Sequence, residues 1–156
     1  MTDPTAAPAV LSVDLDALSR NYRTLGQVSG LPVHPVVKAD GYGLGAQVVA
    51  TRLMAEGART FFVARVTEGL CLRDALGSQS AGGPVIYVLD GCRAGEAGAL
   101  RAADLRPVLN HPAQMQDWTA AGGGACGLQI DTGMNRLGFR PEDAPETFDG
   151  LALVLT

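Results

Sequence analysis

The sequence predicts an α/β fold in which parallel strands alternate with helices, as in part of a (β/α)8 barrel. Short apolar runs typical of strands recur along the chain, and segments with a 3.6-residue hydrophobic period separate them. Strands separated by single helices form parallel βαβ units. The runs are continuously apolar, as expected for strands that are buried on both faces. They are Pro32–Val37, Thr60–Ala64, Val85–Leu89, Arg106–Leu109, Cys126–Asp131 and Leu151–Leu155.

About six βα units can be counted in this pattern, whereas a closed barrel of this class has eight. Because strand number, tilt and shear must agree before a barrel closes, six strands would leave two open parallel edges. The last run ends one residue before the end of the sequence. We therefore expect the barrel to be truncated before closure, and the sequence to be a fragment.

Four helices are predicted from periodicity and from residues that favour helix ends. Asp14 is a suitable N-cap for the first helix, and Thr67 for a helix through Leu76. Pro112 suits the first turn of a helix through Ala121. The apolar faces of the first two helices consist of Leu15, Leu18, Tyr22 and Leu25, and of Ala46, Val49, Ala50, Leu53 and Met54.

The composition indicates a globular protein with a hydrophobic core. Hydrophobic residues make up 47% of the 156 residues and charged residues 18%. The net charge of −4 and the scattered basic residues provide no face for nucleic acid. No apolar run approaches the length that spans a membrane, and the first ten residues lack the features of a signal peptide. We expect a soluble cytoplasmic protein that binds neither nucleic acid nor a membrane.

Cysteine and histidine are not arranged as a metal site. Cys71, Cys92 and Cys126 are odd in number, widely spaced and set in apolar runs, so we expect reduced, buried thiols. His34 is expected in the core or at its rim, and His111 in a loop before a helix. No cluster has the spacing of metal ligands, and we expect no bound metal.

Lys38 is the first candidate for chemistry, because it ends the run Pro32–Val37 and a glycine-rich turn follows it. A lysine at the carboxyl end of a strand faces the mouth of an α/β fold, where such folds hold their active sites. Beside a turn able to approach a phosphate, its amine suggests a Schiff base to pyridoxal phosphate. The alternative is a solvated lysine beside an ordinary turn. Gly41, Gly43 and Gly45 allow positive φ, and they lack the pattern of a nucleotide-binding loop.

A second motif lies downstream, where the run Cys126–Asp131 leads into a glycine-punctuated loop that carries Arg136. Together with the first motif, it resembles a known family. VVKADGYGLG, residues 36–45, is similar to the cofactor-attachment motif of the alanine racemases, and IDTGMNRLGF, residues 130–139, is similar to their second landmark. The resemblance covers the chain from about Val10 onward, and only the first half of a complete family member.

The resemblance implies a fold-type III barrel that binds pyridoxal phosphate, followed in complete members by a mostly β second domain. Residues 1–14 would form an N-terminal extension whose strand, Val10–Val13, packs on that second domain. Residues 15–156 would form the incomplete barrel domain. The implied activity is the interconversion of L- and D-alanine, which supplies D-alanine for peptidoglycan, and complete members are expected to be homodimers.

The resemblance also implies roles for individual residues. Lys38 would carry the cofactor as an aldimine and act as the base for the D-enantiomer, whereas a tyrosine of the second domain would serve the L-enantiomer. The Tyr42 hydroxyl would bind the cofactor phosphate. Arg136 would lie near the phenolic oxygen of the cofactor and the substrate carboxylate, a role that suits its planar charge.

The residues around Arg136 are expected to shape its loop. We expect a structural role for Asp131, and we expect Met134 and Asn135 to form part of the mouth. Many family members have a carbamylated lysine at the position of Gln129 that braces the arginine. Glutamine cannot form a carbamate, so Arg136 must be held differently, by the Gln129 amide or by an anion.

Two alternatives to an alanine racemase remain open. The chain could be a truncated, inactive remnant that binds the cofactor, or one half of a split protein. It could also belong to a racemase of serine or of another small amino acid. Residues that select the substrate would lie largely outside this sequence.

Overall fold

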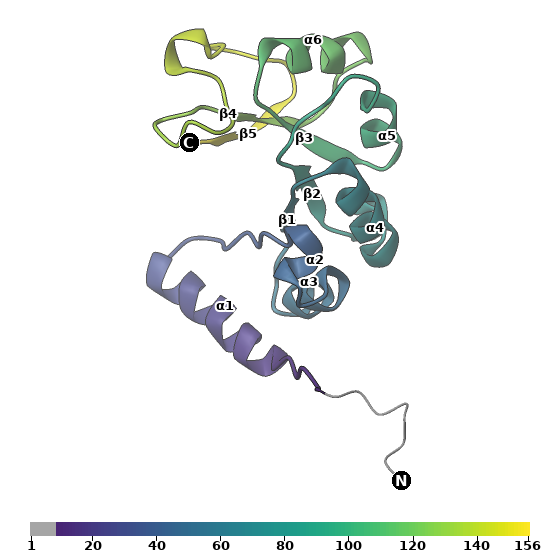
Figure 1. Ribbon diagram of the computed structural model, residues 1–156, viewed down its shortest axis with the longest axis vertical. Coiled ribbons are helices and arrows are strands. Elements are labelled where there is room, and N and C mark those ends of the chain that lie inside the picture. The colour runs from purple at the N-terminus through teal and green to yellow at the C-terminus, as the bar shows by residue number, and fades with distance from the viewer. Residues whose placement is uncertain (1–8) are drawn as a thin grey trace.

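A parallel five-stranded sheet, curved into a half-barrel, organises the computed structural model, which describes residues 9–156 (Figure 1). The strands lie side by side in chain order, so each pairs with the strand that follows it. The prediction of a partial barrel is thus confirmed. The strands are β1 (Thr60–Val63), β2 (Val85–Val88), β3 (Leu105–Leu109), β4 (Cys126–Gln129) and β5 (Leu151–Leu155).

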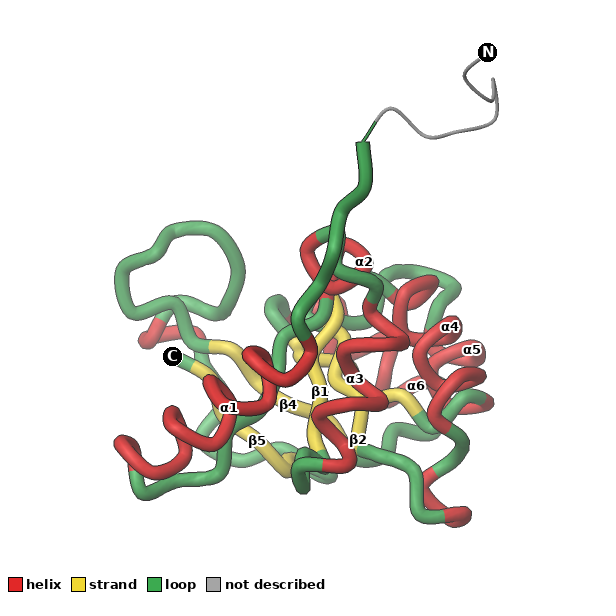
Figure 2. Tube along the Cα trace, turned by 90° about the horizontal axis from the view of Figure 1, so that it is seen from below, coloured by secondary structure: helices red, strands yellow, loops and turns green. Residues whose placement is uncertain are grey.

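Helices cover one face of this sheet. Figure 2 shows α3, α4, α5 and α6 together on one side of the strands, and α1 packs on α3. The helices are α1 (Leu15–Ser29), α2 (Lys38–Tyr42), α3 (Ala46–Ala55), α4 (Val66–Leu76), α5 (Ala97–Ala102) and α6 (Pro112–Ala120), with 3-10 turns η1 (Gln79–Ala81) and η2 (Pro141–Asp143). Within residues 9–156, no helix is both long enough and apolar enough to cross a bilayer.

Successive strand residues point to opposite faces of the sheet, and both faces are apolar. Phe61 and Val63 of β1 belong to the larger core between the sheet and the helices. Phe62 lies on the concave face, where its ring stacks on Tyr87 with 5.3 Å between the ring centroids. Each large apolar side chain buried in this way contributes about 1.5–3 kcal/mol to folding. The continuous apolar runs of the sequence therefore reflect burial on two faces.

The first helix begins where the sequence predicts. The Asp14 carboxylate accepts hydrogen bonds from the backbone N–H groups of Ala17 and Asp16, both at 2.9 Å. These bonds, that of Ala17 foremost, lower the pKa of Asp14 below its ordinary value. Helix α1 is joined to α3 by Arg52, which donates to the buried Ser19 hydroxyl at 2.7 Å and pairs with Asp16.

Two predicted strands are not formed as expected. The run Pro32–Val37 contributes only one bridge, between Val36 and Phe62, because prolines at positions 32 and 35 lack the N–H groups that a ladder needs. Residues 10–13 form no strand in this structure, and Val10 is 87% exposed. The rest of the expected N-terminal extension, residues 1–8, lies outside the described residues, and its packing on a second domain stays a prediction.

The predicted start of α4 is also wrong. Thr67 lies inside the helix, whose N-cap is Arg65. The backbone N–H of Arg65 donates instead to the Glu68 carboxylate at 3.1 Å. A carboxylate in the first turn can bind these unpaired N–H groups as well as a capping hydroxyl can, and it also suits the positive end of the helix.

Arg73 binds the loops at the amino ends of the strands. Arg73 is only 8% exposed, and its guanidinium donates to four backbone carbonyls at 2.7–2.9 Å. These carbonyls belong to Gly77, Pro84, Ala103 and Asp104, and Asp104 also places its carboxylate 3.9 Å from the guanidinium. One side chain thus satisfies acceptors from two crossover connections.

The three thiols are free, but they differ in exposure. Cys92 and Cys126 are buried, as the sequence predicts, and burial raises the pKa of each to about 11. Cys71 is exposed on α4, so the prediction of burial is wrong there. The next residue, Leu72, is buried in the same helix, whereas Leu70 is exposed like Cys71.

Replacing Arg73 with methionine should destabilise the fold by roughly 3 kcal/mol, because several buried carbonyls would lose their donors. Urea unfolding would measure this change. Arg20→Met is the matched control, since Arg20 forms only an exposed ion pair with Asp14 and should contribute less than about 1 kcal/mol. Equal stability of the two variants would contradict the role given to Arg73.

Only one thiol of the folded chain should react rapidly with a disulfide reagent at pH 8. Cys71 should account for it, because Cys92 and Cys126 are buried and weakly ionised at that pH. Cys71→Ser should abolish the fast phase, and unfolding should release two slow thiols. A second fast thiol in the folded Cys71→Ser variant would show that a buried cysteine is accessible.

Candidate active site

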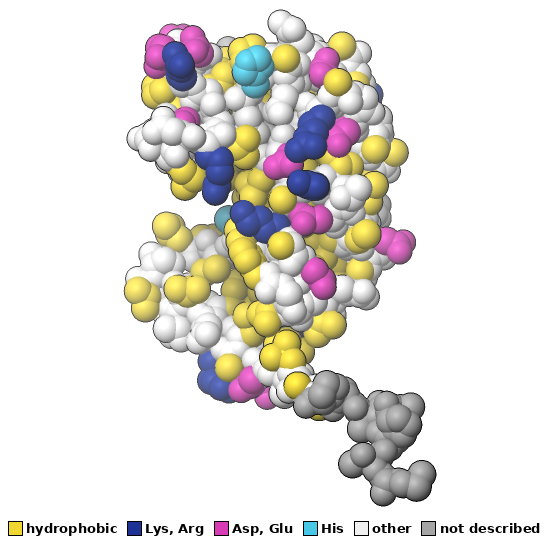
Figure 3. Space-filling model, in the orientation of Figure 1, with side chains coloured by type: hydrophobic (Ala, Val, Ile, Leu, Met, Phe, Trp, Pro, Cys, Tyr) yellow, Lys and Arg dark blue, Asp and Glu magenta, His cyan; other side chains and the backbone are white. Residues whose placement is uncertain are grey.

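The carboxyl ends of the strands border an open cavity of about 460 Å³. Both sequence motifs contribute side chains to it, so the structure brings the two motifs together. Figure 3 shows the molecule hollowed between α1 and the loops that follow β4, with Lys and Arg side chains beside the hollow. The lining residues are Lys38, Ala64, Leu89, Asp90, Gln129, Met134, Arg136, Leu137, Leu155 and Thr156.

The backbone after Lys38 makes one turn of left-handed helix. Ala39, Asp40, Gly41 and Tyr42 have φ values of 51°, 51°, 63° and 57°. The sequence predicted a glycine-rich turn here, and three of these four residues are not glycine. Left-handed backbone costs a non-glycine residue roughly 1–2 kcal/mol, so contacts with the surrounding structure must hold this turn.

Hydrogen bonds close the turn and join it to α3. Within the turn, the Gly41 N–H donates to the Val37 carbonyl at 2.9 Å and the Gly43 N–H to the Ala39 carbonyl at 3.0 Å. The Asp40 carboxylate accepts from the N–H of Ala46, the first residue of α3, at 2.8 Å. Asp40 therefore works as a cap for the helix that follows the turn.

Tyr42 lies beside Lys38 but not in the same cavity. The Lys38 Nζ is 5.9 Å from the centroid of the Tyr42 ring, within the range of a cation–π contact. The Tyr42 side chain is 62% exposed and lines an apolar groove of about 260 Å³ between α1 and the turn. Its predicted role toward a phosphate stays a prediction.

Asp131 organises the loop that carries Arg136. Its carboxylate accepts hydrogen bonds from the N–H groups of Asn135 and Gly133, both at 3.0 Å. These donors lower the pKa of the carboxyl below its ordinary value. Asn135 adds a bond from its side-chain amide to the Gly133 carbonyl at 3.0 Å. The loop geometry thus agrees with the structural role that we expect for Asp131.

Arg136 is exposed at the cavity, and Met134 borders it as predicted. Among residues 9–156, no hydrogen bond joins Arg136 to Gln129, so the first of the two alternatives, bracing by the Gln129 amide, is not observed. The Gln129 carbonyl instead accepts from the Phe139 N–H at 2.8 Å and closes the base of the loop. The Arg136 side chain lines the cavity, and it forms no hydrogen bond or ion pair with the part of the chain that the structure describes.

Two acidic residues near the cavity were missed from the sequence. Asp90 follows β2, lines the cavity, and lies 2.8 Å from the Arg93 guanidinium and 3.9 Å from that of Arg65. Glu68 binds the backbone beside Lys38, as its Oε1 accepts from the Ala39 N–H at 2.9 Å. Asp90 could have been found by considering acidic residues just after each predicted strand, because it directly follows the run Val85–Leu89.

The cavity combines one nucleophilic amine with a guanidinium suited to an anion. Lys38 is the only lysine among the 156 residues, so the single side-chain amine of the chain lies at this cavity. The cavity volume of about 460 Å³ falls in the range of about 300–1,000 Å³ that is usual for small-molecule sites. The arrangement can form a covalent bond to an aldehyde at Lys38 and bind a carboxylate or phosphate at Arg136.

Comparisons with known proteins agree with this geometry. Residues 13–153 match the family model described as alanine racemase, N-terminal domain. The alanine racemase of Jannaschia sp. strain CCS1 is 47% identical over 146 residues, which are 93% of this chain and 42% of that protein. The chain thus spans less than half the length of the curated relatives that it matches.

Solved structures give the same result. The alanine racemase of Bartonella henselae, solved with covalently bound pyridoxal phosphate, superposes with a TM-score of 0.75 at 33% identity, covering 84% of this chain and 39% of that one. The biosynthetic alanine racemase of Pseudomonas aeruginosa gives 0.73 at 29% identity, covering 91% and 41%. The family model covers most of the chain, and this chain therefore belongs to the alanine racemase N-terminal domain family.

Proposed function

We propose that this chain is the cofactor-binding part of an alanine racemase and that it carries pyridoxal phosphate on Lys38. One observation carries the proposal: the only lysine and Arg136, although distant in the sequence, line one cavity at the carboxyl ends of the strands. The covalently bound cofactor of the Bartonella henselae relative supports it.

The residues present fit this cofactor by their chemistry. The Lys38 amine can bond to its aldehyde, and the Arg136 guanidinium can bind an anionic oxygen of the cofactor or the carboxylate of alanine. Tyr42 would supply a hydroxyl for the phosphate from the neighbouring groove. When bound, pyridoxal phosphate makes the α-hydrogen of an amino acid acidic by withdrawing electrons from the α-carbon.

Racemisation then needs a group that removes the α-proton on one face of the substrate and a group that returns a proton on the other. Lys38 Nζ would hold or release the proton on one face. Arg136 would fix the carboxylate, so that the α-carbon stays in reach of Nζ. The expected homodimer, the cytoplasmic location and the supply of D-alanine for the cell wall belong to this proposal as well.

A second candidate is a cofactor-binding protein without racemase activity, either a remnant or one half of a split protein. The observation that favours it is the coverage, since the chain spans 42% of the Jannaschia relative. The family is expected to draw its second proton-transfer group from outside this span. Assays of cofactor attachment and of racemisation separate the two candidates.

Reduction with borohydride in the presence of pyridoxal phosphate should attach one pyridoxyl group to Lys38. The only competing amine is the N-terminus, because the chain has no second lysine. Peptide mapping by mass spectrometry would measure the ratio of the two labels. Lys38→Arg should leave only the N-terminal label, and a wild-type label confined to the N-terminus would refute the cofactor site.

Purified chain with pyridoxal phosphate and L-alanine should form D-alanine, and Lys38→Ala should lower the rate by at least about a hundredfold, because one proton-transfer group is lost. Chiral chromatography would follow both enantiomers, with L-serine as the competing substrate. Labelled Lys38 without D-alanine would favour the second candidate. Faster turnover of serine would reassign the substrate.

A further inference from the structure

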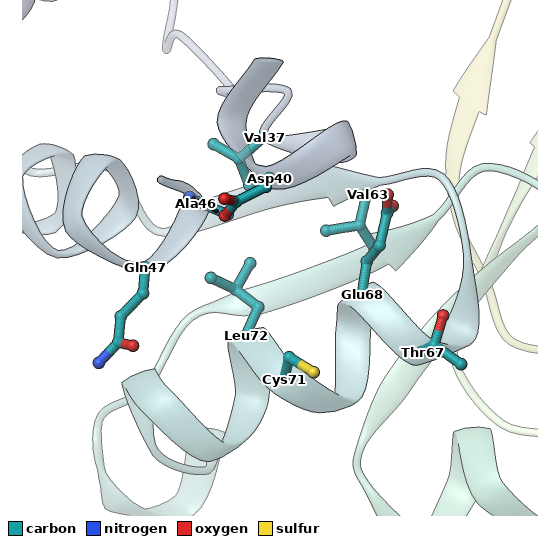
Figure 4. A pocket seen from close by; sticks show the side chains of 9 residues that line it. All are labelled: Val37, Asp40, Ala46, Gln47, Val63, Thr67, Glu68, Cys71 and Leu72. Carbon is teal, nitrogen blue, oxygen red and sulfur yellow. Dashed lines mark hydrogen bonds between the residues drawn. The ribbon is translucent and has the colours of Figure 1, made fainter. Parts of the chain in front are cut away.

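We infer that Glu68 is a positioning residue for Lys38. The inference rests on the proposed function, since it concerns how the amine is presented to the cofactor. Glu68 lies in the first turn of α4, and its side chain extends toward Val63 and the turn that begins at Lys38, whereas Thr67 points away (Figure 4).

One carboxylate joins two segments that are far apart in the sequence. Its Oε1 accepts from the Ala39 N–H at 2.9 Å. Its Oε2 accepts from the N–H groups of Ala64 at 2.7 Å and Arg65 at 3.1 Å. Three backbone donors thus converge on Glu68, two from the residues that join β1 to α4 and one from the left-handed turn. Bonds of this kind to a charged acceptor are stronger than those to a neutral one.

The Ala39 N–H belongs to the peptide group that directly follows the Cα of Lys38. A peptide group is planar, so fixing its N–H fixes ψ of Lys38. On the other side, the Val37 N–H donates to the Phe62 carbonyl of β1 at 2.8 Å. The lysine backbone is therefore held to β1 from both sides, directly through Val37 and indirectly through Glu68.

This attachment matters because the turn is unfavourable by itself. Ala39, Asp40 and Tyr42 have positive φ. Without contacts to the rest of the structure, the free energy of the backbone would fall if these residues left the left-handed region. Asp40 binds the far end of the turn to α3, so Glu68 is the side chain that holds the near end, where the lysine lies. Loss of Glu68 should let the Lys38 side chain leave the cavity direction while α4 and the sheet persist.

The test compares reductive labelling by pyridoxal phosphate in wild type, Glu68→Ala and Asp74→Asn. Asp74 is an exposed acidic residue on the same helix, so its variant controls for the change of charge. We expect Glu68→Ala to lower the ratio of Lys38 label to N-terminal label about tenfold, the size expected for one lost hydrogen bond to a charged group. Asp74→Asn should keep the wild-type ratio.

A second reagent separates positioning from general disorder. Acetylation of Lys38 by sulfosuccinimidyl acetate requires only an accessible, uncharged amine, so Glu68→Ala should leave the acetylation rate close to that of wild type. If Glu68→Ala does not fold, Glu68→Gln replaces it. Glutamine keeps one acceptor oxygen but presents an NH2 group to the remaining donors, so its ratio should lie between those of wild type and a full loss.

The possible outcomes are distinct. A wild-type ratio in folded Glu68→Ala, or an equal change with both reagents, would overturn the role of Glu68 and leave the proposed function intact. If wild type itself shows no preference for Lys38, the cofactor site fails and the inference fails with it. A loss of preference confined to pyridoxal phosphate and to Glu68 variants would support the inference.

Discussion

All neighbouring strands in this chain are parallel, so the amino ends of all the strands lie on one side of the sheet and their carboxyl ends lie on the opposite side. Each return requires a crossover over one face of the sheet. From β1 to β4, every crossover contains one α-helix, and these helices bury the convex side. The two ends of the strands therefore differ. The connections that return from the helices enter at the amino ends, and the loops that lead to the helices leave at the carboxyl ends.

At the amino ends of the strands, hydrogen bonds from a buried side chain hold the connections. Arg73 donates to carbonyls of two separate connections there and is buried in doing so. At the carboxyl ends of the strands lie a left-handed turn, an exposed arginine and an open cavity. Carboxylates order the backbone at the carboxyl ends as well, since Asp40, Glu68 and Asp131 each accept hydrogen bonds from backbone N–H groups.

Hydrophobic patterning was sufficient to predict the five strands and the class of fold, because strands buried on both faces form continuous apolar runs. It failed for Pro32–Val37, where prolines interrupt the ladder, and for α5, whose six residues are too few to show a period. The two motifs located Lys38 and Arg136 at one cavity. Glu68 was missed because its function depends on a contact between segments 29 residues apart, which no local pattern contains.

The handedness of the turn was equally hidden, because Ala39 and Tyr42 have no intrinsic preference for positive φ. Such a conformation is decided by the contacts around it. Sequence reasoning identifies the residue types that a site needs more readily than the backbone geometry that presents them. Here the geometry depends on side chains from a neighbouring helix.

The single lysine has a consequence for proteolysis. A lysine-specific protease can cut this chain at only one peptide bond, that between Lys38 and Ala39. That bond carries the N–H that Glu68 accepts, and it opens the left-handed turn. Proteases bind extended backbone, so cleavage must wait until the turn opens. When the turn closes again faster than the protease cuts, the cleavage rate is proportional to the population of the open turn. The rate of cleavage at this bond therefore measures the local stability of the turn.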